Sequence, residues 1–111
     1  MATVPGCDMA IVEPAKVAGY LLSNSHPIGR GKAHFFTQFG FRQNAPVVLA
    51  RALLDHVRIH NFADVQVSAY GAKYRVDGYL ASPDRRNPRV STVWMIRNGE
   101  NAPRFITAFP C

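Results

Sequence analysis

The spacing of hydrophobic and polar positions changes near Asn61 and divides the chain into two parts. Before Asn61, apolar residues recur three and four positions apart, which predicts amphipathic helices over about 14–23, 32–39 and 46–61. After it, apolar and polar residues alternate, which predicts strands over 65–68, 74–80, 89–97 and 104–109. Helices followed by strands predict an α+β fold, with three N-terminal helices packed on one face of a four-stranded antiparallel sheet.

Local signals define the ends of these helices. Pro14 suits the first turn of the first helix, Gly40 ends the second, and Asn44 is predicted to cap the third. The inward face of the third helix is predicted to consist of Val47, Ala50, Leu53, Leu54 and Val57.

The same helical geometry predicts where three polar side chains point. Lys32 precedes Phe35 and Phe36 by three and four residues, so its ammonium is expected to point toward the edge of the sheet. His34 and His56 fall on the opposite sides of their helices and are predicted to be exposed.

Length and composition bound the class of protein. A chain of 111 residues predicts a single domain over 1–111. No stretch approaches the roughly 20 apolar residues of a membrane helix, and the N-terminus lacks the features of a secretory signal, so we expect a cytoplasmic protein without membrane attachment. Cys7 and Cys111 are too few for a disulfide scaffold, and the sequence does not show whether they ever pair.

The charge balance points to an anionic partner. Thirteen basic residues, ten of them arginines, face seven acidic ones, for a net charge of +6. Arginine offers a planar set of donors that matches phosphate and carboxylate oxygens, so the composition favours nucleic acid or an acidic protein as partner.

One loop concentrates candidate chemistry. His26-Pro27-Ile28-Gly29-Arg30-Gly31-Lys32 contains a histidine, two glycines and two cations directly before a helix. The glycines permit close approach of a ligand, and the helix N-terminus favours an anion. The spacing is not that of a Walker loop. A polar connection with a chance histidine remains the alternative interpretation.

Basic and aromatic residues also alternate through the predicted strands. The basic ones are Lys73, Arg75, Arg85, Arg86, Arg89, Arg97 and Arg104, and the aromatic ones are Tyr70, Tyr74, Tyr79 and Trp94. Cations contact phosphates and aromatic rings stack on bases, so we predict a nucleic-acid surface of Arg30, Arg75, Arg85, Arg86, Arg89 and Arg97. By alternation, Thr92 and Trp94 share one face of the sheet, whereas Arg104 and Thr107 do not.

The sequence argues against a metal centre. His56 and His60 have the spacing of two ligands on one helix, but no third ligand follows them, and clustered carboxylates for a two-metal nuclease are missing. No G-x-S-x-G elbow is present. Any nuclease of this composition is expected to work without metal or other cofactor, through His, Lys, Arg, Tyr and Thr.

Four blocks resemble a bacterial family that bears a domain-of-unknown-function label. Residues 26–36 match its H-P-x-G-x-x-K-A-x-F-F motif, 70–78 its Y-G-x-K-Y-x-V-D-G block, 92–94 its T-V-W block, and 103–110 its P-R-x-x-T-A-Y-P block. Phe109 stands where the family usually has Tyr, so no chemistry is assigned to that ring.

The order of helices and strands, with these blocks, is also similar to the barnase–EndoU–colicin–RelE class of ribonuclease toxins. That resemblance implies a metal-independent endoribonuclease toxin of a toxin–antitoxin or toxin–immunity pair. In this class RNA cleavage is an internal transesterification in which the 2′-hydroxyl attacks the adjacent phosphorus. The implied site has His26 as acid or base and Lys32 and Arg104 as charge stabilisers, with Lys73, Asp77, Thr92 and Thr107 as further candidates.

Two other functions remain open. One is a non-catalytic nucleic-acid-binding module on the same basic surface, and the other is an immunity or antitoxin-like module that binds a protein. The toxin interpretation implies RNA as substrate and a small acidic antitoxin or immunity protein, encoded nearby, as partner.

Overall fold

The computed structural model describes residues 2–111 and places all helical segments before the strands. The helical part consists of a 3₁₀ turn over Cys7–Met9, α1 over Pro14–Lys16, a π-helical turn over Val17–Leu21 (the π-turn), α2 over Gly29–Gln38 and α3 over Pro46–Ile59. The strands are β1 over Phe62–Ser68, β2 over Gly71–Tyr79, β3 over Arg89–Arg97 and β4 over Arg104–Pro110. The predicted α+β fold, with N-terminal helices and a four-stranded antiparallel sheet, is confirmed.

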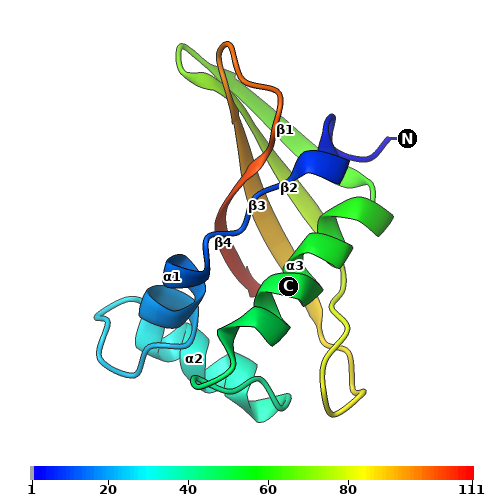
Figure 1. Ribbon diagram of the computed structural model, residues 1–111. Coiled ribbons are helices and arrows are strands. Elements are labelled where there is room, and N and C mark those ends of the chain that lie inside the picture. The colour runs from blue at the N-terminus through cyan, green and yellow to red at the C-terminus, as the bar shows by residue number, and fades with distance from the viewer. Residues whose placement is uncertain (1) are drawn as a thin grey trace.

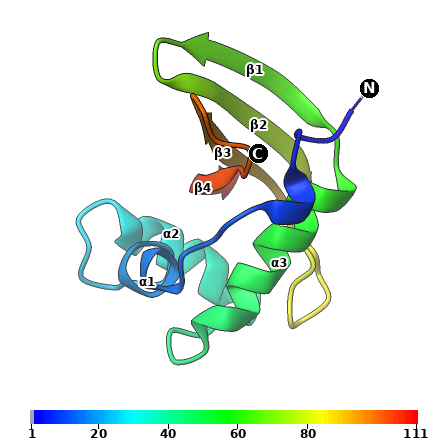
Figure 2. The same cartoon turned by 45° about the horizontal axis from the view of Figure 1, so that its top comes forward.

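The strands form one antiparallel meander in the order β1-β2-β3-β4 (Figure 1). α3 lies across one face of the sheet, and α1 and α2 lie beside β4 (Figure 2). No helix among residues 2–111 has the length and apolar character needed to cross a membrane.

Two segments cover the outer edge of β4. The backbone of Ile11 runs parallel to the start of the strand, where its N–H donates to Pro103 O and its carbonyl accepts from Phe105 N–H. Farther along the strand, the Lys32 side chain reaches the carbonyl of Ala108. The segment before α1 therefore hydrogen-bonds to the backbone at the start of this edge, and Lys32 of α2 hydrogen-bonds to the backbone near its end.

The buried stripe of α3 differs in part from the predicted one. Its members recur at helical spacing and are Leu49, Ala50, Ala52, Leu53, His56 and Val57. Val47, predicted to face inward, is 61% exposed. The N-cap is Ala45 and no side chain caps the helix, so the predicted Asn44 cap is also wrong. The buried face of α3 was placed wrongly because the true face includes a histidine, His56, which the sequence pattern counts as polar.

His56 is only 1% exposed, so the prediction that it faces solvent is wrong. Trp94 Nε1–H donates to Thr92 Oγ1 at 2.8 Å, which leaves the Thr92 hydroxyl to donate to His56 Nδ1 at 3.0 Å. His56 Nε2–H then donates to Gly78 O at 3.0 Å. Each polar side-chain group in this series of hydrogen bonds has a partner, which allows a neutral imidazole to take the place of an apolar side chain in the core.

Candidate functional site

The π-turn directs Tyr20 toward β4. Leu22 N–H donates to Val17 O, five residues back, so the turn is wider than that of an α-helix. The Tyr20 hydroxyl lies 3.2 Å from Thr107 Oγ1, at hydrogen-bond distance and 87 residues apart in sequence. This contact joins the first helical segment to the middle of β4.

His26 caps the start of α2. Its Nδ1 accepts from the backbone N–H groups of Ile28 and Gly29, at 3.1 and 3.0 Å. With Nδ1 acting as acceptor, the proton of the neutral ring lies on Nε2, which is therefore a donor. The ring packs edge-on against Tyr20, with 5.1 Å between centroids. The histidine thus has a structural role at Nδ1 and an available donor at Nε2.

Gly29 explains one position of the H-P-x-G motif. A Cβ on Gly29 would lie 2.0 Å from the carbonyl oxygen of Tyr20, which is backbone and has no flexible end to move away. Only glycine therefore allows α2 to begin directly against the π-turn. This close approach is what brings His26 and Lys32 to the same end of the molecule as Tyr20.

Gly29→Ala should therefore lower the free energy of unfolding by about 2 kcal/mol or more, because the two backbones must separate. Gly31→Ala is the matched control in the same helix, since nothing lies within 4 Å of a Cβ built on Gly31. That variant should be neutral or more stable by up to about 1 kcal/mol, through helix propensity. Urea denaturation measures both. Equal stabilities for the two variants would contradict the proposed role of the Tyr20–Gly29 contact.

Lys32 points to the sheet edge, as its helical position predicted. Its Nζ donates to Ala108 O at 2.9 Å and lies 6.0 Å from the ring centroid of Tyr20 and 5.6 Å from that of Phe109. Its ammonium has three N–H donors, so the bond to Ala108 leaves two for a ligand. We call the group made by Tyr20, His26, Lys32, Thr107 and Phe109 the edge cluster.

The strand register places most of the other predicted catalytic residues on the face of the sheet opposite α3. We call this face the open face. Partners in adjacent strands project to the same side, and three rows follow from the register. The rows are Gln66–Lys73–Met95–Arg104, Asp64–Arg75–Val93–Thr107 and Asp77–Ser91–Phe109. Lys73, Asp77, Arg75, Arg104 and Thr107 therefore share one face.

The prediction that Arg104 and Thr107 lie on opposite faces is wrong. Val93 pairs with Thr107 and Trp94 with Phe105, so Ile106 is the extra residue of a β-bulge. One extra residue reverses the alternation between 104 and 107. The bulge thus brings a cation and a hydroxyl to the same side of β4.

Asp77 is tied into the open face. Its Oδ1 accepts from Ser91 Oγ at 2.6 Å and from Arg75 Nε at 3.2 Å. Partial burial raises the pKa of Asp77, but these two hydrogen bonds and the charges of Arg75 and Arg89 lower it by more, so it lies below its usual value. Asp77 is therefore an acceptor that holds Arg75 flat along β2.

Thr92 and Arg104, like Lys73 and Asp77, lie outside the edge cluster. Thr92 is fully buried on the α3 side of the sheet, where its hydroxyl links His56 to Trp94. Arg104 is at the other end of β4, within 3.7 Å of Glu13 and 3.4 Å of Glu100. Two carboxylates already pair with the Arg104 guanidinium. These ion pairs hold the start of β4 in place.

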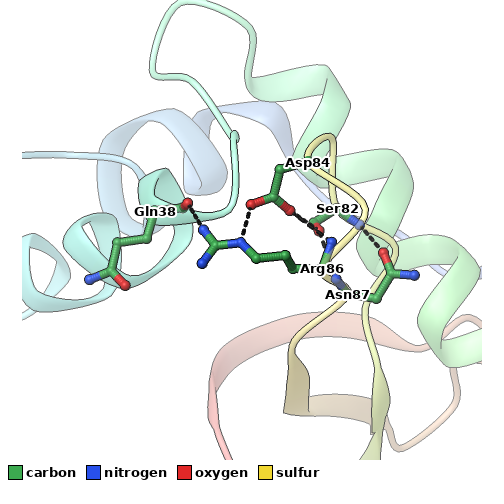
Figure 3. Close-up of polar contacts among 5 residues, drawn as sticks. All are labelled: Gln38, Ser82, Asp84, Arg86 and Asn87. Carbon is green, nitrogen blue, oxygen red and sulfur yellow. Dashed lines mark hydrogen bonds and ion pairs between the residues drawn. The ribbon is translucent and has the colours of Figure 1, made fainter.

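Arg86 has a structural role in the β2–β3 loop (Figure 3). Its guanidinium bonds to Asp84 and to the carbonyl of Gln38, and it stacks 4.6 Å from the ring centroid of Phe39. Ser82 and Asn87 exchange two further hydrogen bonds across the same loop. These contacts fasten the β2–β3 loop to the end of α2.

The remaining predicted arginines are distributed around the surface. Arg75 lies on the open face, and so does Arg89, because it is two residues from Ser91 on β3. Arg97 lies on the same face at the end of β3, whereas Arg85 is exposed in the β2–β3 loop and Arg30 on α2. Three of the six predicted nucleic-acid residues, Arg75, Arg89 and Arg97, therefore lie on the open face.

Sequence reasoning did not assign Tyr20 and Phe109 to the site. Tyr20 falls at apolar helical spacing with Val17 and Leu21, so its pattern is that of a core residue. Only the π-turn, which no sequence pattern indicated, directs it to β4. The described residues contain no group of three or more His, Cys, Asp or Glu side chains placed to hold a metal ion.

One solved structure with a similar fold is described as a contact-dependent growth inhibition toxin–immunity protein complex from Klebsiella pneumoniae 342. The match has a TM-score of 0.72 and 19% sequence identity, and it covers 92% of this chain and 100% of that one. At this identity the similarity shows a shared fold. No curated protein is detectably similar in sequence. A family model described as Domain of unknown function (DUF6883) matches residues 3–111, so the chain belongs to the DUF6883 family.

Proposed function

We propose that this chain is a metal-independent endoribonuclease domain of a toxin, whose activity is held in check by a small acidic immunity or antitoxin protein. The observation that carries the proposal is the position of the edge cluster at the border of the open face. An RNA backbone that lies across the cations of this face passes the free donors of His26 and Lys32.

The chemistry of cleavage matches the groups of the edge cluster. The 2′-hydroxyl gives its proton to water as its oxygen attacks phosphorus, and the 5′-oxygen takes a proton from water as its bond to phosphorus breaks, so that a 2′,3′-cyclic phosphate and a 5′-hydroxyl form. Negative charge grows on the phosphorane oxygens. Lys32 Nζ and His26 Nε2–H are donors for that charge, and Tyr20 and Thr107 carry exchangeable hydroxyl protons beside them.

Residues beyond the cluster have supporting roles in this proposal. Arg89 is an exposed cation of the open face and suits a phosphate beside the cleaved bond. Asp77 orients Arg75 through the hydrogen bond between them. Thr92 and Arg104 stabilise the fold around the site.

Both the charge and the structural similarity support a protein partner. A net charge of +6 favours association with an acidic protein over a basic one. The similar chain from Klebsiella pneumoniae 342 comes from a complex of a toxin with its immunity protein. A partner that covers the open face would block access of RNA to the edge cluster.

Incubation of the purified protein with total RNA should produce fragments that end in a 2′,3′-cyclic phosphate, and excess EDTA should not reduce the rate. RNA with 2′-deoxy substitution at the cleaved positions should bind but remain intact, because it lacks the attacking hydroxyl. Gel analysis and mass spectrometry of the fragment ends give both results. If RNA binds with a steep dependence on salt between about 50 and 200 mM and is never cleaved, the non-catalytic binding module is the correct function.

A further inference from the structure

A hollow lies on the open face, next to the edge cluster. It has a volume of about 140 Å³ and is lined by Asp64, Gln66, Lys73, Arg75 and Val93. These residues come from β1, β2 and β3. The volume is close to that of an engineered protein cavity that holds one benzene ring, so the hollow suits a single aromatic ring system.

The hollow and the edge cluster lie on one row across the sheet. Asp64 pairs with Arg75, Arg75 with Val93, and Val93 with Thr107, which hydrogen-bonds to Tyr20. Adjacent strands are about 4.8 Å apart, so the floor of the hollow lies about 5–10 Å from Thr107. That is comparable to the distance between a base and the phosphate of its own nucleotide.

The lining favours a base over a phosphate. A phosphate site would not include a carboxylate, because the two charges repel each other. Asp64 makes no ion pair within residues 2–111, so its oxygens remain acceptors for a ligand. Val93 provides an apolar floor, and the guanidinium of Arg75 is fixed beside it through the bond to Asp77. An apolar floor with a few polar groups around it is the usual construction of a site for a flat ligand.

We propose that this hollow binds guanine, in the nucleotide that supplies the 2′-hydroxyl, and so sets the cleavage specificity of the proposed ribonuclease. Guanine presents two adjacent donors, N1–H and the N2 amino group, which match the two oxygens of Asp64. Its O6 and N7 are acceptors for Lys73, and the Gln66 amide can pair with either kind of group. Adenine, cytosine and uracil lack that pair of adjacent donors. The inference rests on the proposed function for its link to cleavage, but base binding is testable without cleavage.

The test compares the four nucleoside 3′-monophosphates by NMR titration, which needs no RNA cleavage. Because the four carry the same phosphate, differences between them report the base. The guanosine nucleotide should bind at least tenfold more tightly than the others and shift the amide signals of Gln66, Lys73 and Val93. Asp64→Asn should remove that preference, since one of the two acceptor oxygens becomes an NH2 group, which cannot accept from a guanine N–H. Asp55→Asn, at an exposed position of α3, should leave it unchanged.

The outcomes separate this inference from the proposed function. Guanine-selective binding that Asp64→Asn abolishes supports the inference even if no RNA is cleaved, in which case the ribonuclease proposal fails alone. RNA cleavage without base preference, unaltered by Asp64→Asn, overturns the inference and leaves the ribonuclease proposal in place. Equal binding of all four nucleotides to the hollow also overturns it.

Discussion

Acidification from pH 7 to pH 4 should lower the free energy of unfolding by about 3 kcal/mol through His56 alone. Burial is the main reason that the pKa of His56 falls from 6.5 to about 4, and the nearby His60 lowers it further, although the hydrogen bond to Gly78 opposes the shift. The folded protein therefore keeps this ring neutral in a range where the unfolded chain protonates it.

The direction of the effect follows from proton uptake. Above pH 6.5 both states hold a neutral His56 and stability does not depend on its titration. Between pH 6.5 and about 4 the unfolded state binds more protons, so stability falls as the pH falls, and below about 4 the loss levels off. The pKa values of Asp77 and Asp84 lie below 3.8, so their contributions are lost only at still lower pH.

His56→Gln isolates this contribution. Its amide N–H₂ can still donate to Gly78, but the side chain does not titrate, so the loss of stability between pH 6.5 and 4 should shrink by about 3 kcal/mol. His34→Gln, at an exposed position of α2, is the control and should retain the wild-type dependence. Urea denaturation at half-unit pH intervals measures all three proteins. An unchanged pH dependence in His56→Gln would show that another group causes the acid sensitivity.

Sequence patterns predicted the fold well because most elements keep one helical or strand pattern over their whole length. β3 was predicted with its observed bounds, since Arg89–Arg97 is rich in β-branched residues and lies between two turn-rich segments. Departures occurred where one residue broke the pattern. The bulge at Ile106 reversed the alternation in β4, and His56 hid the true stripe of α3 behind a polar residue. Neither feature is visible in hydrophobicity, because each depends on hydrogen bonds to distant strands.

The candidate site could be predicted only in part, for a related reason. The direction of Lys32 required nothing beyond helical spacing, and the structure confirms it. Tyr20 depends on the π-turn, and the contact of Gly29 with the carbonyl of Tyr20 depends on tertiary packing. The sequence indicated His26 as a functional residue, but not that its Nδ1 caps α2. A residue's type predicts its chemistry, whereas its bonded partners decide which of its atoms remain available.

This double role of His26 makes Ala and Asn substitutions at that position informative. His26→Ala removes both nitrogens, so it should cost about 1 kcal/mol of stability through the lost cap and also abolish the Nε2–H donor. His26→Asn places an amide oxygen near the position of Nδ1, so it should preserve the cap and remove only the donor. If Nε2–H stabilises the phosphorane, both variants should cleave RNA roughly 10²–10³-fold more slowly, while only His26→Ala loses stability.

His34→Asn is the matched control, because it changes a histidine of the same helical region that is exposed and should leave the rate unaltered. Single-turnover cleavage of a fluorescent RNA, together with thermal unfolding of each variant, separates the two effects. Wild-type cleavage by His26→Asn would mean that the histidine acts only as the cap of α2, and the charge of the phosphorane would then be stabilised by Lys32 and the hydroxyls of Tyr20 and Thr107. Equal losses of rate in a stable and a destabilised variant would instead place the function on the one atom that both lack, Nε2.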